Sequence, residues 1–94
     1  MEMGCLIYLA EVEMSKKDVI FADVLAEVYR AEQHFPPMRS AHEGWAILRE
    51  EVDELWEEVK DKGRSRVRMR SEAIQVAAMA VRFVLDVCEV EDVF

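Results

Sequence analysis

The chain contains little cysteine and histidine, and each shortage removes a class of protein from consideration. Only two of the 94 residues are cysteines, Cys5 and Cys88, and neither belongs to a C-x-x-C metal pair. Two cysteines do not make a disulfide framework, so a reducing, cytoplasmic setting is expected. The two histidines, His34 and His42, form no E-x-x-H pair with an upstream glutamate, which argues against a ferritin-type di-iron bundle.

Long apolar runs and positive charge are also scarce. The apolar stretch "CLIYLA" near the start is too short to span a bilayer, and it lacks the basic leader and cleavage site of a signal peptide. No membrane partner is therefore expected. The net charge of −8 argues against nucleic-acid binding, which needs a basic surface. Residues 1–14 are predicted to be a poorly ordered N-terminal extension, and residues 15–94 a single domain.

Three stretches carry the periodicity and the end signals of α-helices. Ser15 followed by Asp18 predicts a capping box, and the helix that it opens ends at "FPPMR" because two prolines remove backbone donors. Ser40 followed by Glu43 predicts a second capping box. A third helix is expected over about residues 65–87. No stretch alternates like a strand, so the predicted class is all-α.

The second and third helices are expected to pack as part of an antiparallel bundle. The second has an apolar seam at three- and four-residue spacing: Trp45, Leu48, Val52, Leu55 and Val59. Gly63 is the expected C-cap glycine of this helix. The third helix contains "AIQVAAMAVRFVL", which is apolar on nearly every side and must be surrounded. Two other helices cannot enclose it, so a homo-oligomer, either a dimer or a dimer of dimers, is predicted to complete the bundle.

The carboxylates of the second helix divide into two sets at about 100° per residue. Asp53 and Glu57 fall on a solvated face, whereas Glu51, Glu54 and Glu58 follow the edge of the seam. This inner set lies on the side of the helix that is expected to face the bundle.

The third helix has a matching polar stripe, which consists of Glu72, Gln75, Met79, Arg82 and Asp86. Across an antiparallel helix pair, Glu72 would join Glu51 and Glu54 in a cluster of three carboxylates. Like charges this close destabilise a fold unless a proton or a cation lies between them. Oxygen ligands without cysteine or histidine select Mg²⁺ or Mn²⁺ over zinc. The alternative, that these acids only solvate a helix surface, stays open at this point because E-x-x-E is common in helices.

The stretches "EEVDELWEEVK" and "SEAIQVAAMAVRF" together resemble the MazG-like, all-α nucleoside triphosphate pyrophosphohydrolases. That family is marked by E-E-x-x-E on one helix and E-x-x-D on the next. Glu50, Glu51 and Glu54 match the first part, and Glu72 opens the second after seventeen intervening residues. Gln75 stands where the family has an aspartate; its carbonyl can ligate a hard cation but brings no charge.

The resemblance implies a MazG-like helical domain that cleaves nucleoside triphosphates between the α- and β-phosphates to give the monophosphate and pyrophosphate. It implies Mg²⁺, with Mn²⁺ as a substitute, on Glu51, Glu54, Glu72 and Gln75, and catalytic roles for Glu50, Glu51 and Glu54. Candidate substrate contacts are Lys60, Arg70, Arg82 and Trp56. The alternative is a non-catalytic helical oligomer or a nucleotide-binding regulatory module derived from the same family, for which Gln75 is the main argument.

Overall fold

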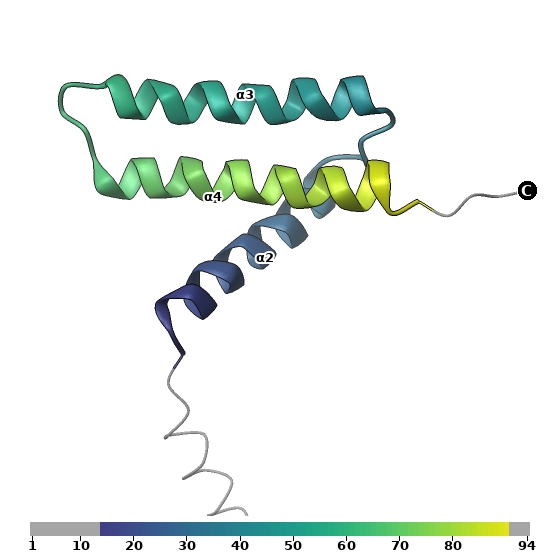
Figure 1. The fold of residues 1–94 in the computed structure, drawn as a ribbon, viewed down its shortest axis with the longest axis horizontal. Helices are drawn as coiled ribbons and strands as arrows, with labels where there is room; N and C mark the ends of the chain where they lie inside the picture. The colour runs from purple at the N-terminus through teal and green to yellow at the C-terminus, as the bar shows by residue number, and fades with distance from the viewer. Residues whose placement is uncertain (1–13, 91–94) are drawn as a thin grey trace, which may run out of the picture.

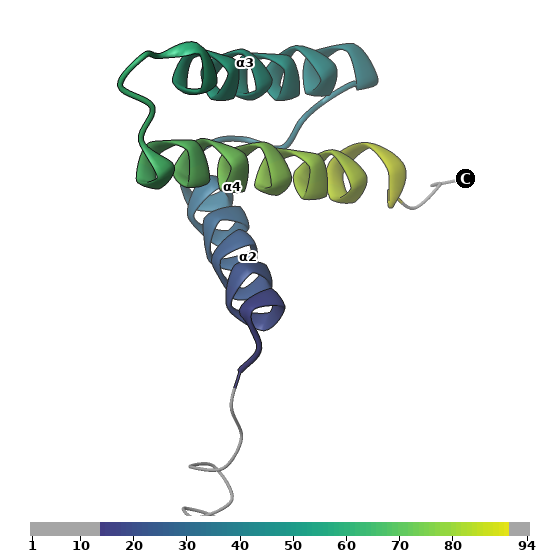
Figure 2. The ribbon, with the colours of Figure 1, turned by 60° about the vertical axis from the view of Figure 1, so that its left-hand side comes forward.

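The computed structural model describes residues 14–90, which are helical and contain no strand. Helix α3 (Ala41–Lys60) and helix α4 (Arg66–Phe83) lie side by side and antiparallel, and α4 continues into a π-helical turn, η1 (Val84–Cys88). Helix α2 (Lys16–His34) crosses this hairpin and packs chiefly on α4 (Figures 1 and 2). The all-α prediction is confirmed for this part of the chain. The predicted extension lies outside the described residues except for Met14.

Helix α2 begins and ends where the sequence predicts. The Ser15 hydroxyl accepts from the Asp18 N–H at 3.1 Å, and the Asp18 carboxylate accepts from the Ser15 N–H at 3.2 Å, so the capping box is complete. At the other end, the Phe35 N–H donates to the Ala31 carbonyl at 2.8 Å. The two prolines that follow cannot donate, and the chain leaves the helix there.

Helix α3 has the expected start but differs from the prediction in how each end is capped. The Ser40 hydroxyl accepts from the Glu43 N–H at 3.0 Å, whereas the Glu43 carboxylate accepts from the N–H of Arg39 at 3.1 Å and not from that of Ser40. The second capping box is therefore only half formed. Gly63 has no positive φ, so the C-cap glycine prediction is wrong. Instead, the Asp61 carboxylate accepts from the Gly63 N–H at 2.7 Å, and this hydrogen bond stabilises the turn that follows the helix.

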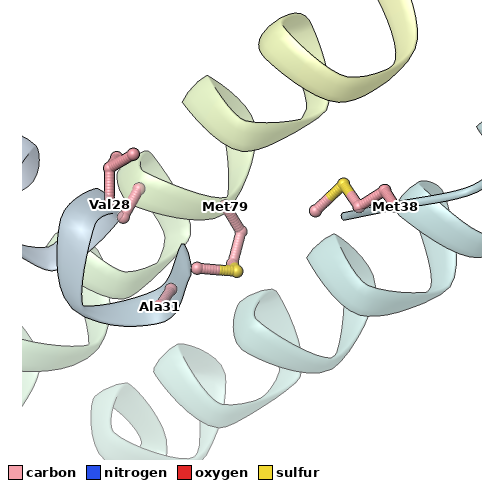
Figure 3. Close-up of a cluster of buried hydrophobic side chains, with 5 residues drawn as sticks. Val28, Ala31, Met38 and Met79 are labelled. Carbon is pink, nitrogen blue, oxygen red and sulfur yellow. The ribbon is translucent and has the colours of Figure 1, made fainter. Parts of the chain in front are cut away.

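The core is small and lies where α2, α4 and the loop before α3 meet. Its buried apolar residues are Val28, Ala31, Met38, Ala78 and Met79. Val28 and Ala31 on α2 lie beside Met79 of α4, and Met38 lies at the entry to α3 (Figure 3). Close approach of α3 to α4 depends on Gly44, because a Cβ at this position would lie 2.6 Å from Cδ2 of Phe83.

The buried face of α3 is rotated from the predicted seam. Leu48, Leu55 and Val59 are partly buried as expected, but Trp45 is 57% exposed and Val52 is 41% exposed. The positions that face α4 instead include Gly44, Ile47, Glu51 and Glu58. At 100° per residue the observed face lies about 60° from the predicted one. The rotation turns the inner carboxylates toward α4 and leaves Trp45, Val52 and Trp56 together on an exposed stripe.

Much of the apolar surface remains uncovered by this single chain. Exposed apolar residues occur on every helix, and the largest exposed fractions belong to Val67 at 78% and Phe21 at 68%. Within residues 14–90, no helix combines the length and the apolar character needed to cross a bilayer.

Candidate metal centre

Three glutamates from two helices converge at the middle of the α3–α4 hairpin. Glu51 and Glu54 lie three residues apart on one side of α3, and Glu72 lies on α4. Each offers one carboxylate oxygen, and the three oxygens all lie within 4.8 Å of one another. Opposite ligands of one octahedral Mg²⁺ are about 4.2 Å apart. Small side-chain rotations would therefore bring this trio to ligand geometry.

The close approach of the three carboxylates changes their acidity. Burial, the charge and hydrogen bond of Glu54, and the charges of Glu72 and Glu50 raise the pKa of Glu51 from 4.5 to about 7. Burial also raises the pKa of Glu72, helped by Glu54 and Glu58. Without a cation, the cluster therefore holds a proton more readily than free glutamates do.

The donor set fits a hard divalent cation. Oε2 of Glu51 is buried and has no hydrogen-bond partner among the described residues, although a buried carboxylate oxygen normally has one. The three groups in the cluster are all carboxylates, with no imidazole or thiolate among them. Such ligands favour Mg²⁺ or Mn²⁺ over zinc.

Gln75 follows Glu72 by one turn of α4 and connects the cluster to α2. Its side chain lines the same surface pocket as Glu27 of α2, and Glu27 accepts from Nε of Arg30 at 2.8 Å. Arg30, with a smaller contribution from Gln75, lowers the pKa of Glu27 despite partial burial. Sequence reasoning did not single out Glu27 or Arg30. Glu27 lies one turn before the buried Ala31 on α2, but that face of the helix is identified only by the packing on α4.

A cavity of about 370 Å³ lies beside the cluster. Its apolar wall consists of Phe35, Pro36, Ile47 and Met79. Its polar lining includes Glu50, Glu51, Gln75 and Arg82. Glu50 is exposed, so it is the carboxylate next to the cluster that solvent and a bound molecule can both reach.

The remaining candidate substrate residues lie in different surroundings. The Lys60 ammonium pairs with Glu57 at 2.9 Å on the solvated face of α3, and the Arg70 guanidinium pairs with Asp23 of α2 at 2.6 Å. Trp56 is 56% exposed. Arg82 is 2% exposed and belongs to the core.

Two further ion pairs involve carboxylates of α3 outside the cluster. Glu58, expected in the inner set, pairs with Arg68 of α4 at 2.9 Å, and Asp53 pairs with Arg49 at 3.2 Å. The acid-rich helix therefore has one group of carboxylates with arginine partners and another group, centred on Glu51, without them in the part of the chain that the structure describes.

Comparison of the chain with protein-family models, curated proteins and solved structures found no match.

Proposed function

We propose that the protein is a Mg²⁺-dependent nucleoside triphosphate pyrophosphohydrolase with a MazG-type bundle that a second copy completes in the cytoplasm. The observation that carries the proposal is the convergence of Glu51, Glu54 and Glu72 with oxygens within 4.8 Å of one another. These are three of the positions that the resemblance to the MazG-like family assigns to metal binding. The unpartnered oxygen of Glu51 supports the same reading.

The chemistry needs positioning and charge neutralisation more than covalent catalysis. Glu51, Glu54 and Glu72 would hold the cation, which when bound neutralises phosphate oxygens and lowers the pKa of a coordinated water. Glu50 is exposed beside the cluster and is the candidate to accept the proton of the attacking water. The cavity next to these groups is large enough for part of a nucleotide, since ligand pockets begin at about 300 Å³.

Two measurements test the proposal together. Pyrophosphate release is measured with Mg²⁺ on a panel of ribo- and deoxynucleoside triphosphates, and thermal unfolding is measured with and without Mg²⁺. Glu54→Gln should reduce activity by more than the roughly 10–100-fold cost of outer-shell substitutions. The matched control Asp53→Asn, on the solvated face of the same helix, should retain activity. If no nucleotide releases pyrophosphate and neither Mg²⁺ nor Mn²⁺ raises the melting temperature, the proposal is wrong.

Gln75 favours a second candidate function, a nucleotide-binding module without hydrolytic activity. Its side chain is uncharged, so this turn of α4 brings less negative charge than the family pattern does. The two functions differ in one result. A binding module would be stabilised by a nucleotide with Mg²⁺ and would release no pyrophosphate.

A further inference from the structure

Arg82 is a buried charged residue whose contacts fix the loop between α2 and α3. Its Nη2 donates to the Pro36 carbonyl at 2.9 Å, and its Nη1 lies 3.6 Å from the sulfur of Met79. The same Nη2 lies 3.8 Å from the Asp86 carboxylate. The Nε of Arg82 is buried without a partner in the part of the chain described, so the guanidinium is held by its two terminal nitrogens.

Asp86 fixes the next polar group of the loop. Its Oδ2 accepts from the Met38 N–H at 2.9 Å, and Met38 itself is 3% exposed. Asp86 lies in η1, where the Glu89 N–H donates to the Val84 carbonyl at 2.8 Å. Such π-helical turns often occur at functional sites. Arg82 and Asp86, one turn apart on the α4–η1 segment, therefore bind the two backbone groups on either side of Pro37. Arg82 binds the carbonyl of Pro36, and Asp86 binds the N–H of Met38.

The loop held in this way is a wall of the cavity beside the glutamates. Phe35 and Pro36 form part of its apolar lining, and Glu50 and Glu51 form part of its polar lining. Arg82 itself is ten residues from Glu72, about 15 Å along the helix axis. The guanidinium is a cation and does not ligate metals, and its hydrogen bond is to the loop, at the Pro36 carbonyl.

A buried ion pair is a poor source of stability, because apolar residues of similar volume serve as well or better. Its directional contacts do fix one arrangement of the loop. We propose that Arg82, supported by Asp86, is a positioning residue that holds the Phe35–Pro36 wall in place to bind the nucleoside part of the substrate. This inference rests on the proposed function and adds to it the place where the uncharged part of the nucleotide lies.

The experiment separates nucleotide binding from metal binding. Arg82→Met, Arg82→Lys and the control Arg49→Met are compared with the unchanged protein. Affinity is measured for Mn²⁺ alone, and for α,β-methylene nucleoside triphosphates with Mn²⁺. Arg82→Met should leave Mn²⁺ affinity unchanged, weaken the analogue about tenfold, and raise KM about tenfold with kcat within about twofold. Arg82→Lys, which can still donate to the Pro36 carbonyl, should recover most of the loss, and Arg49→Met should behave like the unchanged protein.

A second measurement uses the unchanged protein and does not depend on whether a variant folds. Neither Pro36 nor Pro37 has an N–H, so the Met38 amide reports directly on the loop. The analogue should slow hydrogen exchange at Met38, whereas Mn²⁺ alone should not. The inference is overturned if the analogue leaves Met38 exchange unchanged, or if folded Arg82→Met binds it normally. Binding with slowed exchange but no pyrophosphate release would reject the proposed hydrolase activity and retain the role of Arg82. If the protein neither binds the analogue nor releases pyrophosphate, both the proposed hydrolase activity and the proposed role of Arg82 are rejected.

Discussion

Neutralising Glu51 should have opposite effects on the metal-free protein and on the metal-bound protein. Burial and three neighbouring carboxylates raise the pKa of this group from 4.5 to about 7. The folded state therefore holds a proton that the unfolded state releases, and stability without metal should fall as the pH rises from about 4.5 to about 7. Glu51→Gln keeps the shape of the protonated acid and removes this dependence.

The pKa sets the size of the effect. At 1.36 kcal/mol per tenfold change, the difference between 4.5 and about 7 corresponds to at most about 3.4 kcal/mol. The cluster is partly open to solvent, which screens the repulsion, so we expect a gain on the order of 1–2 kcal/mol for Glu51→Gln at pH 8. For a domain of this size each kcal/mol corresponds to about 4–8 °C in Tm.

Thermal unfolding of both proteins at pH 5 and pH 8, at one protein concentration, provides the assay. Without metal the variant should be the more stable protein at pH 8, and the difference should be much smaller at pH 5. With Mg²⁺ at a hundred times Kd, the unchanged protein should gain about 2.7 kcal/mol and the variant much less. Glu57→Gln, on the solvated face, should stay within about 0.5 kcal/mol throughout. A variant that is less stable than the unchanged protein at pH 8 without metal would refute the reasoning.

Three further predictions concern the packing of α3 and the charge of the site. Gly44→Ala should lower stability by about 1 kcal/mol in a thermal melt, because the new Cβ would lie 2.6 Å from the Phe83 ring and overpacking outweighs the better helix propensity of alanine. Trp45→Arg should leave the helical content unchanged but weaken self-association about thirtyfold by sedimentation, as expected for an exposed tryptophan in an interface; a monomeric unchanged protein would contradict this. Gln75→Asp should tighten Mg²⁺ binding about tenfold by calorimetry, because it adds a charged ligand; weaker binding would show that this side chain faces away from the ion.

Local signals predicted the helix starts well, because these depend on neighbouring residues. Ser15 and Ser40 both accept from the amide three residues later, as the sequence indicates. The rotation of α3 was not predictable in this way. Apolar periodicity favours the face with Trp45 and Val52, whereas packing against α4 places Gly44 and Glu51 inside. A periodic pattern cannot distinguish a face that packs within the chain from one that remains for a partner.

The geometry of the candidate site, like the rotation of α3, depends on packing that local sequence signals do not determine. The spacing of Glu51, Glu54 and Glu72 indicated that they could meet across an antiparallel hairpin, and their oxygens do lie within 4.8 Å of one another. The spacing could not exclude a solvated face, because it does not fix the rotation of α3. The contribution of α2 was not predictable. Glu27 reaches Gln75 only because α2 crosses α4, and the crossing depends on the small core around Ala31 and Met79.

The rotation of α3 connects the acid-rich sequence to its proposed use. If α3 presented only its most apolar face to α4, Trp45 and Val52 would be covered and Glu51 would lie at the edge of the helix contact. The observed packing instead exposes two large apolar residues and buries an unpartnered carboxylate oxygen, and both changes destabilise an isolated chain. A cation at the glutamates would relieve one cost, and a second copy on the Trp45 stripe would relieve the other. Under the proposed function, a bound cation and a second copy would therefore both stabilise this orientation of α3.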